Sequence, residues 1–159
     1  MTTKNSDLVA NFEASPQVFN NAALLGGEMR VAQGTIELAA GDSTDNDIVM
    51  LAPIPSHATI PQLFIGTDTF GGSCTFNVGL YLPDGTVKDE DCFATSVADA
   101  AAMADVRFEV ADLNTAGQRV YELAGDSTDP GDYYYVAVTF NATGGTGGTM
   151  SFNIVYVVN

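Results

Sequence analysis

Basic residues are scarce in this sequence of 159 residues. Lysine and arginine number 5 together, against 20 aspartates and glutamates, so the formal net charge is −15 at pH 7. The basic residues are scattered singly, at Lys4, Arg30, Lys88, Arg107 and Arg119. Nucleic acids and anionic membranes are bound by clustered basic side chains that meet phosphates. We therefore expect no nucleic-acid or membrane partner, and we expect any partner surface to be basic or apolar.

Long apolar runs are also missing. No stretch approaches the roughly 18 apolar residues that a membrane-spanning helix needs. The first residues, from Met1 to Asp7, are polar and lack the apolar segment of a secretory signal. The sequence therefore predicts a soluble protein that is made in the cytoplasm.

The 2 cysteines and 1 histidine are too few for a zinc site. Cys74 and Cys92 flank a predicted hairpin whose turn is expected at residues 83–86. That turn places Cys74 nearer Thr95 than Cys92, so a disulfide needs a bulge or a shifted register. We interpret both cysteines as buried thiols in a reducing compartment, with a disulfide as the alternative.

Apolar residues are abundant despite the acidity, at 46% of the chain with a mean hydropathy of +0.12. Acidic chains that stay disordered are usually poor in such residues. A chain of this length fits one domain and can bury roughly 70% of its unfolded surface. We therefore expect a packed core, with the acidic residues confined to loops and surface.

Alternation with a period of two predicts β-strands, and it is clearest from Cys74 to Leu82, Tyr133 to Asn141 and Thr149 to Val158. In the last segment, Val155 and Val157 make the final part apolar on both sides. Further strands are expected at Arg30 to Ala40 with a bulge at Gly34, Asp47 to Ile54, Ala58 to Gly66, Thr86 to Phe93, Val106 to Val110 and Gln118 to Ala124.

One short helix is expected from Ser96 to Met103, because Ser96 and Asp99 have the spacing of a capping box before an alanine-rich run. Eight or nine strands with a single helix exclude an alternating βαβ sheet. The predicted fold is all-β, a jelly-roll-like antiparallel β-sandwich of about eight strands with one short helix. Residues 1–25 have little periodicity and are predicted to form an N-terminal arm, and residues 26–159 the sandwich domain.

Two acidic loops repeat one motif, at residues 37–47 and 122–132. In a jelly roll they would fall at opposite ends of the sandwich, because the second and seventh strands run antiparallel. Their carboxylates and hydroxyls are ligands that calcium prefers, yet the spacing departs from the EF-hand pattern. Gly, Asp, Ser and Thr are also the residues of tight turns, and we favour turns over a metal site.

Other polar and aromatic residues have two interpretations each. Asp84, Lys88 and residues 89–91 form a third acidic patch, which we interpret as a charged edge strand that discourages pairing, with a docking surface as the alternative. His57 is interpreted as a loop residue, since no serine nucleophile motif accompanies it. Tyr133 and Tyr135 could face a partner or a sugar opposite Tyr134, although packing is favoured.

Strand and turn patterns without catalytic residues extend across nearly the whole chain, at residues 2–9, 34–38, 45–51, 78–81 and 125–131. In these patterns the sequence resembles small virion proteins of tailed bacteriophages, including cyanophages. This resemblance implies a capsid cement or decoration protein with a jelly-roll-like fold, seated as a homotrimer on the outside of an icosahedral head. The implied partners are the major capsid protein and further copies of the chain, and the implied location is the virion, assembled in the host cytoplasm.

A cement protein needs an apolar contact that reaches its neighbours. We expect Val18, Phe19, Leu24 and Leu25 to anchor the arm on a neighbouring subunit or on the capsid. No catalytic residue, cofactor or metal is expected. Two alternatives stay open, a tail or head-fibre component that binds glycans through its β-sandwich, and a hydrolase.

Overall fold

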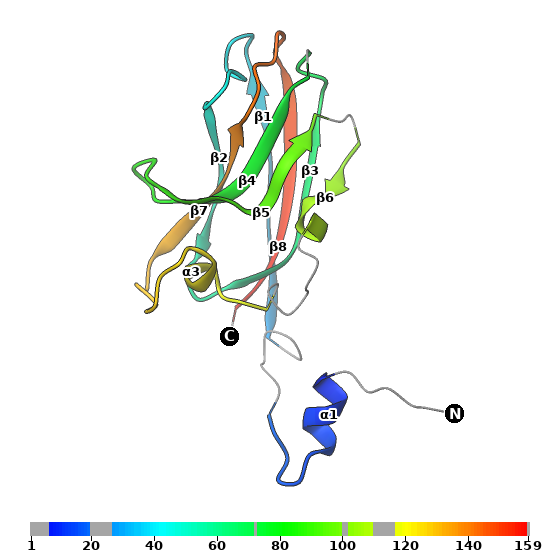
Figure 1. Cartoon of the computed structure of the whole chain (residues 1–159), viewed down its shortest axis with the longest axis vertical. Helices are drawn as coiled ribbons and strands as arrows, with labels where there is room; N and C mark the ends of the chain where they lie inside the picture. The colour runs from blue at the N-terminus through cyan, green and yellow to red at the C-terminus, as the bar shows by residue number, and fades with distance from the viewer. Residues whose placement is uncertain (1–6, 20–26, 72, 100–101, 110–116, 159) are drawn as a thin grey trace, which may run out of the picture.

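The computed structural model describes residues 7–19, 27–71, 73–99, 102–109 and 117–158. Within them, the strands form two four-stranded antiparallel sheets that stack on each other (Figure 1). The first sheet has the order β1-β8-β3-β6, and the second sheet has the order β2-β7-β4-β5. The strands are β1 (Glu28–Leu38), β2 (Ile48–Pro55), β3 (Thr59–Thr67), β4 (Thr75–Tyr81), β5 (Val87–Ala98), β6 (Ala104–Asp105), β7 (Tyr133–Phe140) and β8 (Gly148–Val158).

The strand pairing defines a jelly roll. Strand β1 pairs with β8, β2 with β7, β3 with β6 and β4 with β5, always antiparallel. Such nested pairs arise when one long eight-stranded hairpin rolls up into two sheets. The predicted all-β sandwich is therefore confirmed.

The predicted helix from Ser96 to Met103 is wrong. Residues 96–98 end strand β5 instead, where Val97 lies opposite Phe76 in the ladder. The Ser96 N–H donates to the Asn77 side chain at 2.9 Å, and the Asp99 carboxylate accepts from the Phe70 N–H at 2.8 Å. The cross-strand ladder thus outweighs the local helical preference of this segment. Residues 100 and 101 lie outside the described residues.

Two predicted strands are also wrong, since their residues form short helical turns. The segment expected at Val106 to Val110 forms the 3₁₀ helix η1 (Val106–Glu109), and Val110 lies outside the described residues. The segment expected at Gln118 to Ala124 forms α3 (Val120–Leu123). Val120 and Ala124 are both buried, and their spacing of four residues puts them on one side of a helical turn. The remaining helix, α1 (Asp7–Glu13), precedes the sandwich.

The expected bulge at Gly34 is absent from the β1–β8 ladder, which keeps one continuous register from Glu28 to Leu38. Gly34 lies directly opposite Phe152. A Cβ atom at position 34 would lie 2.8 Å from the ring of Phe152. The glycine is therefore explained by the space that the Phe152 ring occupies on the inner face.

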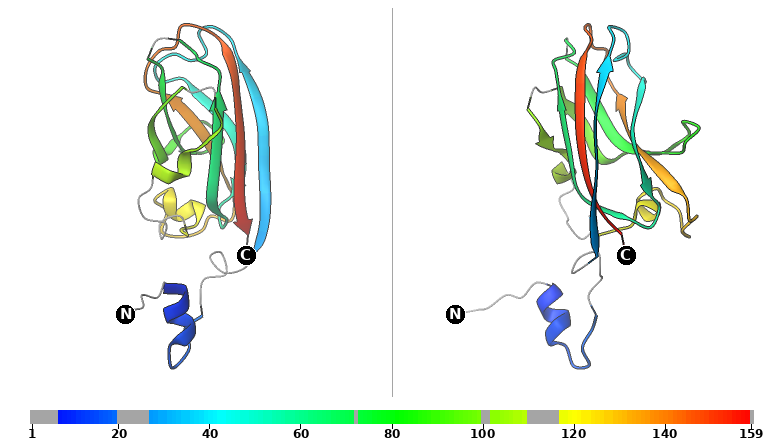
Figure 2. Two further views of the ribbon diagram at one scale, coloured as in Figure 1. Left: turned by 90° about the vertical axis from the view of Figure 1, so that its right-hand side faces the viewer. Right: turned by 180° about the vertical axis from the view of Figure 1, so that it is seen from behind.

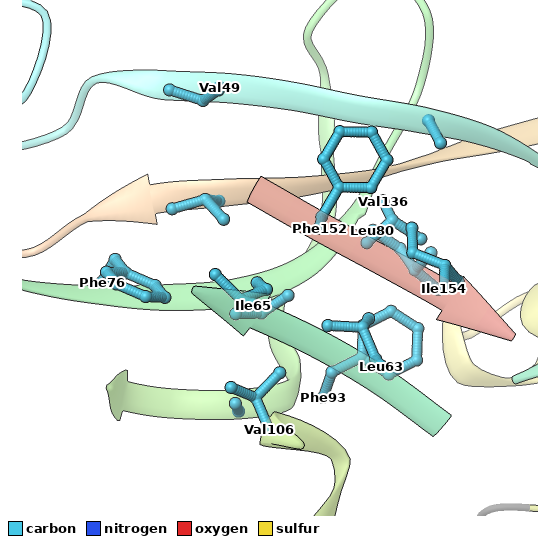
Figure 3. Packing of buried hydrophobic residues seen from close by; sticks show 14 of the residues in the cluster. Val49, Leu63, Ile65, Phe76, Leu80, Phe93, Val106, Val136, Phe152 and Ile154 are labelled. Carbon is cyan, nitrogen blue, oxygen red and sulfur yellow. The ribbon is translucent and has the colours of Figure 1, made fainter. Parts of the chain in front are cut away.

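The core lies between the two sheets, and alternate side chains of both sheets interlock there (Figure 3). Ile65 and Ile154 come from the first sheet, and Leu80 and Val136 from the second sheet. All four are buried, with 3% exposure or less. Three phenylalanines pack edge to face at one end of the core: Phe70, Phe76 and Phe140. Burial of this kind is the main stabilising contribution in a domain without disulfides.

Strand β5 crosses over the outer face of the second sheet. Its register against β4 shifts, because Val78 lies opposite Ala94 whereas Leu80 lies opposite Asp89. The extra residues of β5 pass so close that a Cβ atom on Gly79 would lie 2.1 Å from the Asp89 carbonyl oxygen. The part of this face around Gly79 is consequently covered by β5 itself.

Replacing Gly79 tests this close crossing. We expect Gly79→Ala to lower the free energy of unfolding by about 3 kcal/mol or more, because the backbone of β5 has to move. Gly145→Ala is the matched control, since a Cβ atom there meets no atom within 4 Å. Urea unfolding followed by circular dichroism measures both variants, and equal stability of the two would contradict the assignment.

Candidate interaction sites

The N-terminal segment carries two of the predicted contact residues. Helix α1 is followed by residues 14–19, which turn back so that the Val18 N–H donates to the Asn11 carbonyl at 3.1 Å. The segment lies beyond the end of the sandwich at which β1 begins (Figure 2). Phe19 is 92% exposed and Val18 is 50% exposed. Leu24 and Leu25 lie outside the described residues, so the structure places two of the four contact residues.

The first acidic loop is organised by its own hydrogen bonds. Asp42 accepts from the Ala39 N–H at 2.8 Å. Asp47 accepts from the Thr44 hydroxyl and, at 2.8 Å, from the Thr44 N–H. These bonds hold the pKa of Asp47 below its ordinary value. Carboxylates that cap backbone N–H groups in this way are turn residues, which supports the interpretation as a turn.

The second acidic loop closes the opposite end of the sandwich, as its place before β7 predicts. Asp129 accepts from the Ser56 hydroxyl at 2.5 Å and from the Gly131 N–H at 2.9 Å. These two bonds hold the pKa of Asp129 below its ordinary value. The Ser56 N–H donates to the Asp132 carbonyl, so the loop is fixed to the turn between β2 and β3. The two loops therefore form no combined site.

Lys88, on β5, forms an ion pair with the second acidic loop. Its ammonium group lies 2.7 Å from the Asp126 carboxylate, which also accepts from the Tyr134 hydroxyl. Lys88 and Tyr134, in that order, hold the pKa of Asp126 below its ordinary value. Burial, and then the negative Asp126, raise the pKa of Tyr134. The pair ties the β4–β5 hairpin to the loop after α3, a contact between residues too distant in sequence to be recognised by pattern.

The acidic patch at residues 89–91 lies on β5, which is an edge strand of the second sheet, as predicted. Burial raises the pKa of Asp89, and the neighbouring Asp91 and Glu90 add to the effect. Cys74 is buried, Cys92 is half-buried and both are free thiols. Burial, and then the charge of Asp89, raise the pKa of the Cys92 thiol, so thiolate chemistry is disfavoured there.

Arg107 is a buried cation that composition did not reveal. Its side chain is only 2% exposed, and its guanidinium carbon lies 5.0 Å from the centroid of the Phe93 ring. Its Nε donates to the Ile60 carbonyl at 3.2 Å. Burial lowers its pKa. Arg107 therefore joins η1 to strands β3 and β5 as a structural residue.

An open groove of about 630 Å³ lies between the edge strands β1 and β2 at the end that the second loop closes. Its walls include Arg30, His57, Asp132 and Tyr133. Tyr133 is exposed and Tyr134 is buried, so the predicted alternation of the tyrosines holds. Arg30 is paired with Glu28 at 3.0 Å. The groove combines an aromatic ring with polar groups, which is the chemistry that sugars require.

The described residues contain neither a metal-binding cluster nor a membrane-spanning helix. No group of three or more histidine, cysteine, aspartate or glutamate side chains lies where it could hold a metal ion. None of the described helices combines the length and the apolar character needed to cross a bilayer.

Comparison with known proteins identifies similar folds. No model of a known protein family matches the sequence, and no curated protein matches it. A chain in the capsid of Ralstonia phage GP4 is 20% identical with a TM-score of 0.54, and the match covers 84% of this chain and 86% of that chain. The jelly-roll fold is therefore shared with a chain of a phage capsid.

Two further capsid structures are similar with lower scores. A chain in the capsid asymmetric unit of cyanophage Pam1 is 15% identical with a TM-score of 0.48, and the match covers 100% of both chains. A chain in the acidic stable capsid of Helicobacter pylori bacteriophage KHP30 is 13% identical with a TM-score of 0.42, covering 83% of this chain and 90% of that chain.

Protonation of Asp126 tests the link between the hairpin and the second loop. We expect Asp126→Asn to lower the free energy of unfolding at pH 7 by about 1–2 kcal/mol. The pKa of Asp126 lies below the ordinary 3.8, so its contribution is present above that value and is lost as the pH falls further. The difference between wild type and variant in urea unfolding should therefore shrink below about pH 4.

Asp45→Asn, an exposed position in the first acidic loop, is the control for the general effect of removing one negative charge. A difference that stays constant down to pH 2, or equal losses in the two variants, would contradict the role of Asp126.

Proposed function

We propose that the chain is a non-enzymatic structural protein of a phage virion, a capsid cement or decoration protein. In this role it binds the outside of an icosahedral head and stabilises contacts between capsomers. The fold shared with a chain of the Ralstonia phage GP4 capsid supports the proposal. So do the exposed Val18 and Phe19 of the N-terminal segment, which lies beyond the end of the sandwich (Figure 2).

The exposure of Phe19 is the observation that carries the proposal. Phe19 is 92% exposed, which leaves nearly all of a large apolar ring in water. Burying such a side chain contributes roughly 1.5–3 kcal/mol, and Val18 beside it adds to the gain. Leu24 and Leu25 continue the apolar character of the segment in sequence and complete the proposed anchor.

The sandwich is suited to stabilising contacts between capsomers, because it is a well-packed body. Its two sheets enclose a continuous core, and its end loops are fixed by hydrogen bonds. A rigid body of this kind loses little conformational entropy when it docks. The proposed partners are the major capsid protein, at a basic or apolar surface, and further copies of the chain in a homotrimer.

Binding to heads tests the proposal. Heads of the encoding virus that lack the protein are incubated with purified chain and sedimented. We expect the double substitution Val18→Ser and Phe19→Ser to weaken co-sedimentation at least tenfold, since about 1.4 kcal/mol of lost binding already has this effect. Deletion of residues 1–25 should leave a folded sandwich that no longer sediments with heads.

Val87→Ser is the matched control, because Val87 has nearly the same exposure as Val18, 48% against 50%, but lies on β5. Unchanged binding of the double variant, or failure of the wild-type chain to bind heads at all, would overturn the proposal.

A tail or head-fibre role with glycan recognition is the second candidate, favoured by the groove beside Tyr133. Under this alternative, the chain should retain specific sugars on a glycan array, and Tyr133→Ala should abolish retention through loss of ring stacking. Tyr135→Ala, at a half-buried neighbour two residues away, serves as the control. An array without specific signals would exclude this candidate.

A further inference from the structure

The outer face of the first sheet is unusually poor in charge. We define the neutral face by the residues of β1, β8 and β3 that alternate away from the core: the pairs Met29–Val157, Val31–Val155, Gln33–Asn153, Thr35–Ser151 and Glu37–Thr149, with Gln62, Phe64 and Gly66 of β3 beside them. Val157 is already buried within the chain, at 7% exposure. Glu37 is the one ionisable residue among these thirteen, and its carboxylate accepts a hydrogen bond from Thr149 at 2.9 Å. In a chain with 20 acidic residues, so few charges on one sheet face require an explanation.

The neutral face also exposes large apolar side chains. Met29 is 70% exposed and Val31 is 53% exposed, next to each other on the strand that forms the sheet edge. Met103, which is 50% exposed, lies against Gly66 of β3 on the same side. Edge strands of soluble proteins are normally protected by charge, as β5 is here. On the neutral face, the edge strand β1 of the first sheet therefore has fewer charged side chains than the edge strand β5 of the second sheet.

A polar group on the neutral face lacks a partner as well. The side-chain oxygen of Asn153 is buried and accepts no hydrogen bond within the described chain. Asn153 lies in the middle strand of this face, between Gln33 on β1 and Phe64 on β3. A buried acceptor without a donor is costly to the isolated chain, but this atom is inaccessible from outside, so it marks a local cost and not a contact for a docked molecule.

We propose that the neutral face is the surface through which copies of this chain associate with each other. Two chains that each carry a net charge of −15 repel, so they can approach only where charge is absent. A basic partner would instead be matched by an acidic surface, which this face does not offer. The charge distribution therefore selects a second copy as the occupant.

The size of the face fits a modest interface. Strand β1 has 11 residues and spans roughly 36 Å at about 3.3 Å per residue. Across β1, β8 and β3 the face is about 14 Å wide, which gives about 500 Å² per copy and about 1,000 Å² in total. This is close to the lower limit of specific interfaces, so weak and reversible association is expected.

Shape complements the charge pattern. Two shallow hollows of about 300 and 200 Å³ lie on either side of Met103, and both include Ser151 in their walls. They can receive an apolar side chain such as Met29 from the opposing copy. Face-to-face contact produces a twofold pair, whereas contact with a different surface of the next copy can close a trimer, and both bury Met29 and Val31.

This inference rests on the proposed self-association and adds the surface that makes the contact. Sedimentation velocity of the purified chain tests it without heads, so its outcome is separate from the outcome of the head-binding experiment. The wild type should associate reversibly above its monomer mass of 16.6 kDa. Met29→Thr with Val31→Thr keeps strand-forming side chains and should raise the dissociation constant at least tenfold. Ile48→Thr with Val87→Thr, two exposed apolar positions on the second sheet, is the matched control and should associate as the wild type does.

Salt and truncation give two further readouts. Added salt should strengthen association, because it screens the repulsion between the like-charged copies while the contact itself is neutral. Deletion of residues 1–25 should leave association intact, which separates this face from the N-terminal anchor. A wild type that stays monomeric at millimolar concentration, association lost on deletion of the arm, or a Met29/Val31 variant that associates normally would each overturn the inference.

Discussion

Keeping fifteen units of net negative charge outside a dry interior is the constraint on which the rest of this structure depends. The interior is formed by alternate side chains of two sheets. Hydrophobic contacts stabilise it without a disulfide, since Cys74 and Cys92 are free thiols. Carboxylates at the two ends, such as Asp47 and Asp129, accept hydrogen bonds from nearby N–H and hydroxyl groups. Acid therefore stabilises the turns that connect the strands, and the charge helps to define the ends of the sandwich.

The fold class could be read from the sequence because alternation with a period of two is a local signal. It correctly located the strands that contribute most to the core, including β4, β7 and β8. The failures occurred where tertiary contacts outweigh local preference. Ser96 had the pattern of a helix start, yet pairing with β4 keeps this segment extended. Gly34 suggested a bulge, whereas the ring of Phe152 accounts for it.

Surface features were only partly visible in sequence. The apolar residues of the arm were visible in the sequence, and Phe19 is exposed, but their role as an anchor stays a prediction. The neutral face was not recognised from the sequence. The only indication was that Val155 and Val157 make the end of β8 apolar on both sides. The ladder of β1 and β8 was needed to place Met29 and Val31 beside them. The partners of Lys88 and Arg107 likewise depend on strand crossings that no spacing rule provides.

We therefore propose a module that works through its surfaces, with the apolar arm binding a larger assembly and the neutral face binding its own copies. A reconstruction of the virion at side-chain resolution tests this account most directly. We expect density for the sandwich on the outside of the head. In that density, Phe19 contacts a capsid subunit and the neutral faces of neighbouring copies contact each other. A head without such density, or sandwiches whose arm and neutral face both point into solvent, would contradict it.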